Sequence, residues 1–204
     1  MFVDIELAIK YFHRLPVSLQ FPSFHPQYTV VDASRDEKIL PLFFIYEEGQ
    51  NFYYHAFHKM QIPMTDYFDL QSPYVYGGPV ATTTDTEFLQ SAWMNYCQWC
   101  NEQNVLAEFI RFHPVAANQQ YYLGSHFYDR STIWIDLTIE ELLTSYCVRT
   151  RTAIRKALKN DLTVECIAGD DFLAVFMDLY METLRALRAD SFYHFSDRYF
   201  QELL

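Results

Sequence analysis

The segment 67–113 carries two strand-like runs separated by one helical stripe, and this order limits the chain to a fold that mixes strands with helices. Tyr67–Leu70 has the pattern of a strand. Thr84-x-x-Glu87 has the form of a capping box, and the apolar spacing after it predicts a helix to about Asn101. Val105–Phe112 is almost entirely apolar, so we expect a strand in the centre of its sheet. The expected fold class is α/β or α+β.

The flanking segments add further elements of both kinds. A four-residue connection that contains glycine predicts a hairpin of two strands, Ile39–Tyr46 and Asn51–Phe57. Helical spacing predicts a helix from Ile5 that breaks near Pro16. The remaining expected elements are a strand at Ile133–Leu137, a long helix from the capping box Thr138-x-x-Glu141 to about Asn160, a strand at Leu162–Ile167, and helices at Asp171–Leu187 and Asp197–Leu204.

Composition excludes several classes of protein. Half of the 204 residues are apolar and 20% are charged, so the chain can bury a sizeable core. A net charge of −11 argues against DNA binding and against broad attraction to anionic membranes. No run approaches the roughly 20 apolar residues of a membrane span, and the first residues lack the features of a signal peptide. We therefore expect a cytoplasmic protein without a membrane span.

Five of the fifteen basic side chains lie within eleven residues of the predicted long helix. They are Arg149, Arg151, Arg155, Lys156 and Lys159. At the angular spacing of a helix, they share about one half of its circumference. This face suits a phosphate-bearing ligand, such as a nucleotide-diphosphate sugar, a lipid diphosphate or the acceptor end of a tRNA. A solvated helix face, with basic residues near the favourable end of the helix dipole, is the alternative.

Cys97 and Cys100 form a Cys-x-x-Cys pair inside the predicted helix that ends near Asn101. No second pair follows at the spacing of a zinc ribbon. Both thiols lie on or beside the apolar face of that helix, where free cysteines commonly pack in the core. We interpret the pair as structural and predict no metal site.

The glycine pair Gly77–Gly78 lies between a predicted strand and a predicted helix. Glycine allows positive φ angles and a close approach of the backbone to a ligand, so bare amides at this point could meet an anion. Tyr74 and Tyr76 beside the pair could bond to or stack on a sugar or nucleotide. An ordinary tight turn with aromatic packing is the alternative.

Glu108 lies among apolar residues of the predicted central strand. Burial would raise its pKa toward the range of a general base that takes a proton from an attacking amine. The alternative is a structural glutamate paired with an arginine. Arg111 is expected on the other face of the strand as an anion clamp, together with His113. His113 precedes Pro114 and is equally interpreted as a structural histidine.

Two of these segments resemble motifs of a known family. Ser72–Pro79 reads Ser-Pro-Tyr-Val-Tyr-Gly-Gly-Pro, and Glu108–Pro114 reads Glu-Phe-Ile-Arg-Phe-His-Pro. Both are similar to segments of the FemAB-related acyltransferases, a branch of the GNAT-like enzymes. Arg151–Ala157 and Phe172–Leu204 also resemble segments of these enzymes, so that the resemblance covers nearly the whole chain.

The resemblance implies two GNAT-like domains in tandem. We expect a GNAT-like mixed sheet flanked by helices at residues 1–145, a connecting basic helix at 146–160, and the truncated start of a second GNAT-like domain at 161–204. A repeated aromatic spacing agrees with an internal duplication, because Phe21-x-x-Phe24-x-x-x-Tyr28 recurs as Phe192-x-x-Phe195-x-x-x-Tyr199.

The same resemblance implies transfer of an acyl or aminoacyl group to an amine of a cell-wall or surface-polysaccharide precursor. The donor would be an acyl-CoA or an aminoacyl-tRNA, and no tightly bound cofactor is expected. Glu108 is the candidate catalytic residue. The candidate substrate-binding residues are Tyr74, Tyr76, Gly77, Gly78, Arg111, His113, Arg151, Arg155 and Lys156.

The expected truncation of the second domain has its own consequence. We expect the chain alone to be weakly active or inactive, unless a partner chain completes that domain. The expected partners are a phosphorylated sugar or peptide precursor and the acceptor end of a tRNA. The alternative function is that of a non-catalytic binding or accessory module for a phosphorylated sugar precursor.

Overall fold

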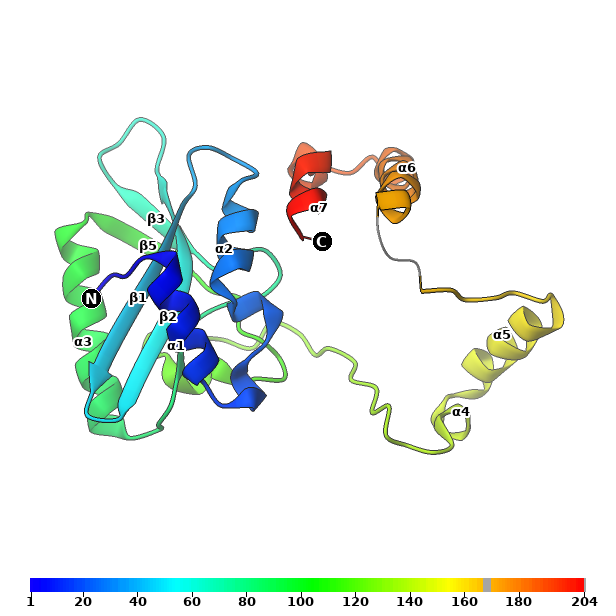
Figure 1. Ribbon diagram of the computed structural model, residues 1–204, viewed down its shortest axis with the longest axis horizontal. Coiled ribbons are helices and arrows are strands. Elements are labelled where there is room, and N and C mark those ends of the chain that lie inside the picture. Colours follow the sequence, from blue (N-terminus) through cyan, green and yellow to red (C-terminus); the bar gives the residue numbers. More distant parts are fainter. Residues whose placement is uncertain (167–169, 204) are drawn as a thin grey trace. The chain divides into compact units, whose positions relative to one another are not determined.

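The computed structural model describes residues 1–166 and 170–203, and they form a mixed α/β protein with a five-stranded sheet and flanking helices (Figure 1). The strands are β1 (Leu40–Glu48), β2 (Asn51–Gln61), β3 (Phe68–Gln71), β4 (Val80–Ala81) and β5 (Val105–Phe109). The α-helices within the described residues are α1 (Ile5–Arg14), α2 (Pro26–Ala33), α3 (Thr86–Glu102), α4 (Leu142–Ser145), α5 (Val148–Lys159), α6 (Asp170–Leu187) and α7 (Asp197–Leu203). The predicted fold class is confirmed at this level.

The sheet contains both antiparallel and parallel neighbours. β1 and β2 form the predicted hairpin, in register from Leu40↔Lys59 to Glu48↔Asn51. The turn between them contains Gly49 at a φ of 62°. β3 pairs antiparallel with β2 and parallel with β5, which gives the strand order β1-β2-β3-β5. The short β4 pairs with β2 as well, next to Tyr53 and Tyr54.

The centre of the sheet is β2, and β5 lies at its edge. The prediction of a central strand at Val105–Phe112 was therefore wrong. Apolar residues there suggested burial on both faces, but Leu106 and Phe109 are 67% and 61% exposed. The strand also ends at Phe109, although an isolated parallel bridge joins Phe112 to Gly77 beyond it.

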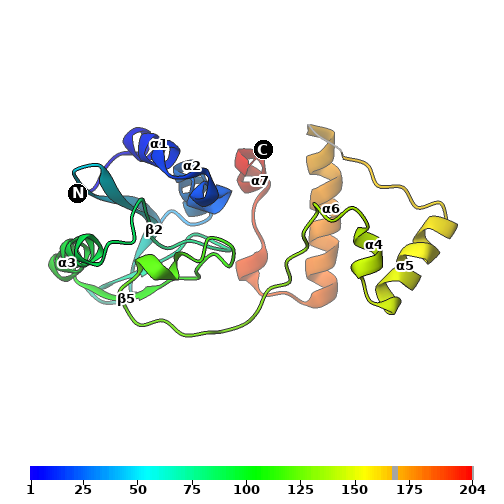
Figure 2. The ribbon, with the colours of Figure 1, turned by 90° about the horizontal axis from the view of Figure 1, so that it is seen from below.

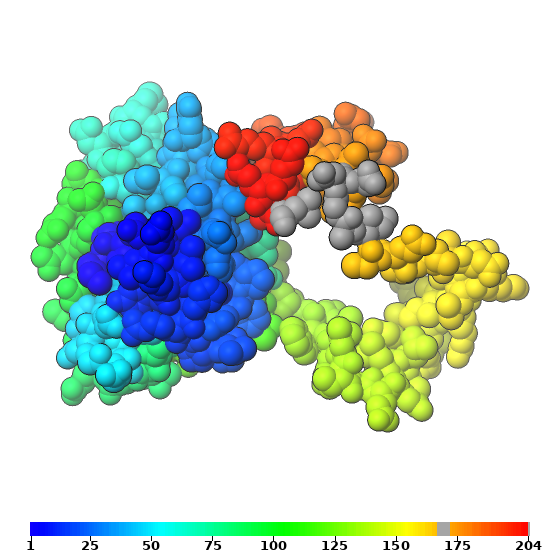
Figure 3. Space-filling view, viewed as in Figure 1, coloured from blue at the N-terminus to red at the C-terminus, as the bar shows by residue number. Residues whose placement is uncertain are grey.

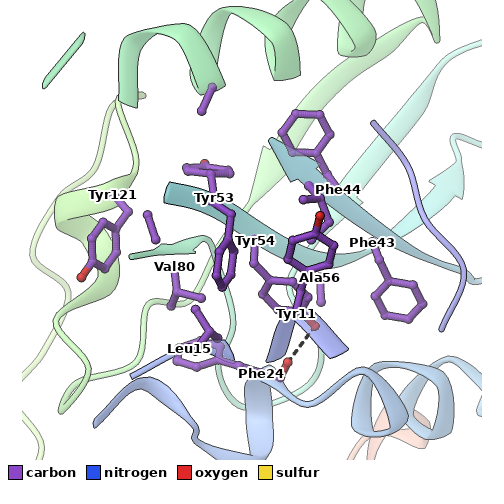
Figure 4. Packing of buried hydrophobic residues seen from close by; sticks show 14 of the residues in the cluster. Tyr11, Leu15, Phe24, Phe43, Phe44, Tyr53, Tyr54, Ala56, Val80 and Tyr121 are labelled. Atoms are coloured by element: carbon purple, nitrogen blue, oxygen red, sulfur yellow. Dashed lines mark hydrogen bonds between the residues drawn. The ribbon is translucent and has the colours of Figure 1, made fainter. Parts of the chain in front are cut away.

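Helices cover both faces of the sheet, with α1 and α2 on one face and α3 on the other (Figure 2). β2 is buried from Phe52 to Lys59, because it lies between neighbouring strands and under helices on both sides. Tyr54 faces the side of the sheet that α1 and α2 cover, where its hydroxyl donates to the carbonyl of Phe24 at 2.9 Å (Figure 4). Phe57 faces α3 and packs edge-on against Tyr96, with ring centroids 5.7 Å apart. Alternation along one strand thus builds two apolar layers.

α3 follows its predicted course but begins with a different cap. Asp85, rather than Thr84, is the N-cap residue, and its carboxylate accepts a hydrogen bond from the backbone N–H of Phe88. An aspartate is as good a cap as a threonine. The sequence therefore located the helix correctly and misplaced its first turn by one residue.

Contacts group the chain into two compact units, Met1–Phe127 with Leu184–Leu204, and Tyr128–Thr183. In the first unit, α7 packs on α2, and the space-filling view shows the red atoms of α7 against blue atoms of the N-terminal part (Figure 3). Tyr199 of α7 is 3% exposed. The predicted domain limits at 145 and 160 stay predictions. The last part of the segment expected to open a second domain, from Leu184 onward, belongs to the first unit.

The second unit differs from its predicted secondary structure in three places. Residues 133–137 form no strand and are exposed, because none of the described strands pairs with them. The single long helix expected there is two helices, α4 and α5, interrupted at Tyr146 and Cys147, which are both extended. Residues 162–166 form no strand, and position 167 of that prediction lies outside the described residues.

The helices can also be compared with a membrane span in length and apolar content. No helix in the described ranges has the length and apolar content that a bilayer crossing requires.

Candidate functional site

The parallel pair β3 and β5 brings two of the predicted motifs together. Because the two strands run in the same direction, the segments that follow them leave the sheet at the same end. The backbone N–H of Arg111 donates to the Ser72 hydroxyl at 3.2 Å, and its carbonyl accepts from the N–H of Gly77 at 2.9 Å. The Ser-Pro-Tyr and Arg-Phe-His segments are therefore one local structure.

Gly77 and Gly78 are buried where these two segments cross. A Cβ on Gly77 would lie 2.7 Å from Cβ of Ser72, and one on Gly78 would lie 2.7 Å from Ile110. Gly78 also has a φ of 96°, which side-chain-bearing residues rarely adopt. The N–H of Gly77 already bonds within the chain. The pair therefore permits close packing of two backbones, and the amide of Gly77 is not free for an anion.

The side chain of Asn118 joins the backbones of the two crossing segments. Its side chain is fully buried, and its amide donates to the carbonyls of Gly77 and Pro79 at 3.0 and 3.1 Å. Its side-chain oxygen accepts from the backbone N–H of His113 at 2.8 Å. One buried amide side chain thus ties the glycine motif to the histidine of the second motif.

His113 is held as a structural histidine. Nδ1 accepts from the backbone N–H groups of Val115 and Ala116, at 3.2 and 3.1 Å. This leaves the proton of the neutral ring on Nε2. The ring lies 4.0 Å from that of Phe21 and is half-buried, and burial lowers the pKa of His113. The structural interpretation of this residue therefore agrees with its contacts.

The two tyrosines of the first motif have different surroundings. The backbone of Tyr74 is clamped by α2, because its N–H donates to Asp32 at 2.7 Å and its carbonyl accepts from the Tyr28 hydroxyl at 2.7 Å. The Tyr74 ring lies 5.3 Å from that of Phe195. The Tyr76 ring meets His113 edge-on at 5.1 Å. Both rings are half-buried, so aromatic packing accounts for part of each side chain.

Arg111 is the exposed cation of this local structure. Within the described chain no carboxylate forms an ion pair with its guanidinium. Its backbone is held on both sides by the hydrogen bonds to Ser72 and Gly77. An anchored backbone with a free guanidinium is suited to bind carboxylate or phosphate, because the planar group donates two parallel hydrogen bonds.

Glu108 lies on β5 and contacts the α3 side of the sheet. Its Oε1 accepts a hydrogen bond from the Tyr96 hydroxyl at 2.7 Å and lies 2.9 Å from Nε2 of His55. The side chain is 9% exposed. Its partner is therefore a histidine on β2, where the structural hypothesis expected an arginine.

The charge of Glu108 also affects neighbouring groups. Burial, followed by the Glu108 carboxylate, raises the pKa of Tyr96 far above its ordinary range. The same two causes raise the pKa of Cys100 to about 12. The side chains of Cys97 and Cys100 are half-buried and form no disulfide bond, and their interpretation as structural residues stays a prediction.

Sequence reasoning missed a second buried charged group, on the opposite face of β2. Asp32 on α2 is fully buried and lies 3.4 Å from Arg35 and 3.7 Å from Nδ1 of His58. Nε2 of His58 donates to the carbonyl of Thr29 at 2.8 Å. The Tyr199 hydroxyl reaches Asp32 at 3.3 Å from α7. The spacing His55-x-x-His58 within a strand was the available signal, since it places one imidazole on each face.

The basic helix is α5 of the second unit. Arg155 and Lys156 are exposed, and Arg151 donates to the carbonyl of Thr144 at 3.1 Å. α5 buries none of its residues. Its charged face is thus accessible, as both the phosphate-binding hypothesis and the solvated-face alternative require.

Comparison with protein-family models, with curated proteins and with solved structures gave no match for this chain. The similarity to FemAB-related enzymes therefore stays a prediction from the motifs. The geometry itself offers a clamped Arg111, without an ion-pair partner among the described residues, just beyond the end of β5, and Glu108 on β5 with 9% of its side chain exposed.

Proposed function

We propose that this chain is an acyltransferase-type protein with a GNAT-like sheet, which transfers an acyl or aminoacyl group to an amine of a cell-wall or surface-polysaccharide precursor. The observation that carries the proposal is the exposed, unpaired Arg111 at the carboxyl ends of β3 and β5. Ligands of sheets with parallel strands bind beyond those ends. An anionic group of the precursor, a phosphate or a carboxylate, would pair with Arg111.

The proposed chemistry needs no covalent enzyme intermediate. The amine nitrogen attacks the carbonyl of a thioester or ester, the new C–N bond forms, and the C–S or C–O bond breaks. The amine proton passes to the Glu108 carboxylate, and the leaving thiolate or alkoxide is protonated from solvent. The task of the remaining residues is to hold the acceptor in place. The guanidinium of Arg111 would do this from a backbone that is fixed by hydrogen bonds to Ser72 and Gly77.

The test measures binding and transfer separately on the purified chain. Arg111→Gln should weaken binding of a diphosphate sugar in a thermal-shift titration by at least about tenfold, since a charge-assisted contact contributes about 1.5–3 kcal/mol. Arg185→Gln is the matched control, because Arg185 is an exposed arginine on α6. Equal binding by wild type and both variants would remove Arg111 from the proposed site.

Transfer is measured with acyl-CoA and charged tRNA as donors and an amino sugar nucleotide as the acceptor. Glu108→Gln should abolish product formation while leaving the Arg111-dependent binding in place. Product formation by the Glu108→Gln variant at the wild-type rate would refute the assignment of the base.

A non-catalytic binding module is the second candidate, and one observation favours it. The Glu108 carboxylate is 9% exposed and is held by His55 and Tyr96, as a structural group would be. Because the chain alone is expected to be weakly active at most, transfer from either donor is also measured with the chain at the concentration of the acceptor. Arg111-dependent binding of the diphosphate sugar without any transfer under those conditions would select this function.

A further inference from the structure

A cavity of about 770 Å³ lies at the start of β3, at the opposite end of that strand from Gln71 and the motif after it. Such a volume is in the range of small-molecule sites. Its walls come from β1, β2, β3 and the β2–β3 turn. The lining residues are Lys38, Leu40, Lys59, Gln61, Pro63, Met64, Thr65, Asp66 and Phe68.

Lys59 is the buried cation of this cavity, with 8% of its surface exposed. Its ammonium donates to Oε1 of Gln103 at 3.0 Å, and lies 4.0 Å from the ring centroid of Phe68 and 5.5 Å from that of Trp99. All these partners are neutral. In the described part of the chain, no carboxylate lies within ion-pair distance of Lys59.

A buried ammonium normally has a carboxylate partner, because desolvation of an unpaired charge is unfavourable. Here burial lowers the pKa of Lys59 from its ordinary value. The other charged residues of the cavity, Lys38 and Asp66, are both exposed. The cavity thus holds one partly desolvated positive charge, and the described residues supply no carboxylate to compensate it.

The apolar part of the cavity is next to this charge. Leu40 lies directly opposite Lys59 in the β1–β2 register, and its side chain is 53% exposed. Phe68 has its ring beneath the Lys59 ammonium. A ligand that places an oxyanion on Lys59 would therefore rest its apolar portion on Leu40 and Phe68.

We propose that this cavity binds a small organic anion, with a carboxylate or phosphate group on Lys59 and an apolar portion on Leu40 and Phe68. The site is separate from the candidate site at Arg111 and does not depend on the proposed transfer activity. The bound anion would supply the missing counter-charge, so that binding relieves the cost of the buried ammonium.

Octanoate, octanol and inorganic phosphate are suitable probes, measured by thermal shift and by calorimetric titration of the whole chain. Octanoate should stabilise the protein, whereas octanol has the same chain without the charge and should not. Lys59→Met should reduce the affinity for octanoate at least about tenfold, as loss of a charge-assisted contact does. Lys59→Arg should retain binding, and Lys10→Met, an exposed lysine of α1, should leave it unchanged.

The variants also separate an anion site from a purely structural lysine. Lys59→Met should not lower the unfolding temperature of the free protein, because it removes an uncompensated charge. If Lys59→Met does not fold, the comparison of octanoate with octanol on the wild-type protein still tests the proposal. Stabilisation by phosphate that requires Lys59, without an effect of octanoate, would assign the oxyanion to phosphate. The proposal is overturned if neither anion stabilises the protein, or if octanoate protects the Lys59→Met variant as well as wild type.

Discussion

His55 and His58 lie on opposite faces of β2, and each ring is next to a carboxylate supplied by a distant part of the chain. Nε2 of His55 is 2.9 Å from Oε1 of Glu108 on β5, and Nδ1 of His58 is 3.7 Å from Oδ2 of Asp32 on α2. Three positions along a strand invert the direction of a side chain. The central strand therefore carries one buried imidazole–carboxylate pair into each helical layer.

Stability should fall as the solution becomes more acidic than about pH 6.5, the usual histidine pKa. Burial lowers the pKa of His58, His25 and His113, so the folded protein takes up these protons less readily than the unfolded chain. Between the lowered pKa values and 6.5, the unfolded chain binds more protons, and the free energy of unfolding decreases as pH decreases.

Thermal unfolding between about pH 7 and about pH 5 measures this effect. His58→Gln should reduce the slope of unfolding temperature against pH, because it removes one of the three groups. His194→Gln is the control, since His194 is exposed. An identical slope in wild type and His58→Gln would show that His58 is not desolvated in the folded protein.

Gly78→Ala should destabilise the protein more than Gly49→Ala. Both positions have positive φ, 96° and 62°, and backbone strain of this kind costs about 1–3 kcal/mol. A Cβ at Gly49 meets no atom within 4 Å, whereas at Gly78 it would meet Ile110 at 2.7 Å and Asn118 at 3.0 Å. Urea unfolding of the two variants separates strain from crowding, and equal losses would contradict the close packing at Gly78.

Asp32→Ala should lower the free energy of unfolding by about 3–5 kcal/mol, because it leaves a buried guanidinium without its carboxylate. The affected partner is Arg35, whose side chain is 10% exposed. The variant also removes the acceptor for the N–H of Tyr74. Asp69→Ala, at an exposed aspartate of β3, should cost much less. If urea unfolding gave comparable losses of unfolding free energy for the two variants, the ion pair of buried Asp32 with Arg35 would be contradicted.

Cys147 should react with iodoacetamide before Cys97 and Cys100 at about pH 8, where thiolate fractions control the rate. Cys147 is exposed at the start of α5, and hydrogen bonds from Thr150 lower its pKa. Burial raises the pKa of Cys97 and Cys100. Timed alkylation followed by peptide mass spectrometry gives the order, and early modification of Cys100 would contradict its half-buried position on α3.

Glu108→Gln should accelerate alkylation of Cys100 severalfold. The carboxylate is the second cause, after burial, of the raised pKa of this thiol, and each unit of pKa lost increases the thiolate about tenfold. Cys147 lies in the other unit and serves as an internal control. An unchanged Cys100 rate with intact folding would show that the Glu108 carboxylate does not raise the pKa of this thiol.

Local patterns predicted the elements that depend on local interactions. The hairpin, α3 and α6 were found from turn residues and apolar spacing. Apolar content misled where it was taken as a measure of burial. Leu106 and Phe109 of β5 are exposed on an edge strand, and Ile133 is 92% exposed in a segment without a partner strand.

The polar contacts of the candidate site could not be predicted, because they join residues far apart in the sequence. Glu108 meets His55 across 53 positions, and Asp32 meets the N–H of Tyr74 across 42. No local pattern records such a pair. The hydrogen bond from the Gly77 amide to the carbonyl of Arg111 likewise joins two distant segments, whose crossing only the fold determines.

The Tyr199 hydroxyl reaches Asp32 from 167 positions further along the chain. During translation, the ribosome therefore releases α2 and β2 long before it has made the aromatic residues of α7. Over that interval Asp32 lacks the hydrogen bond from Tyr199, whereas its partners Arg35 and His58 are already made, so the two ion pairs of this carboxylate can form before its last hydrogen bond does.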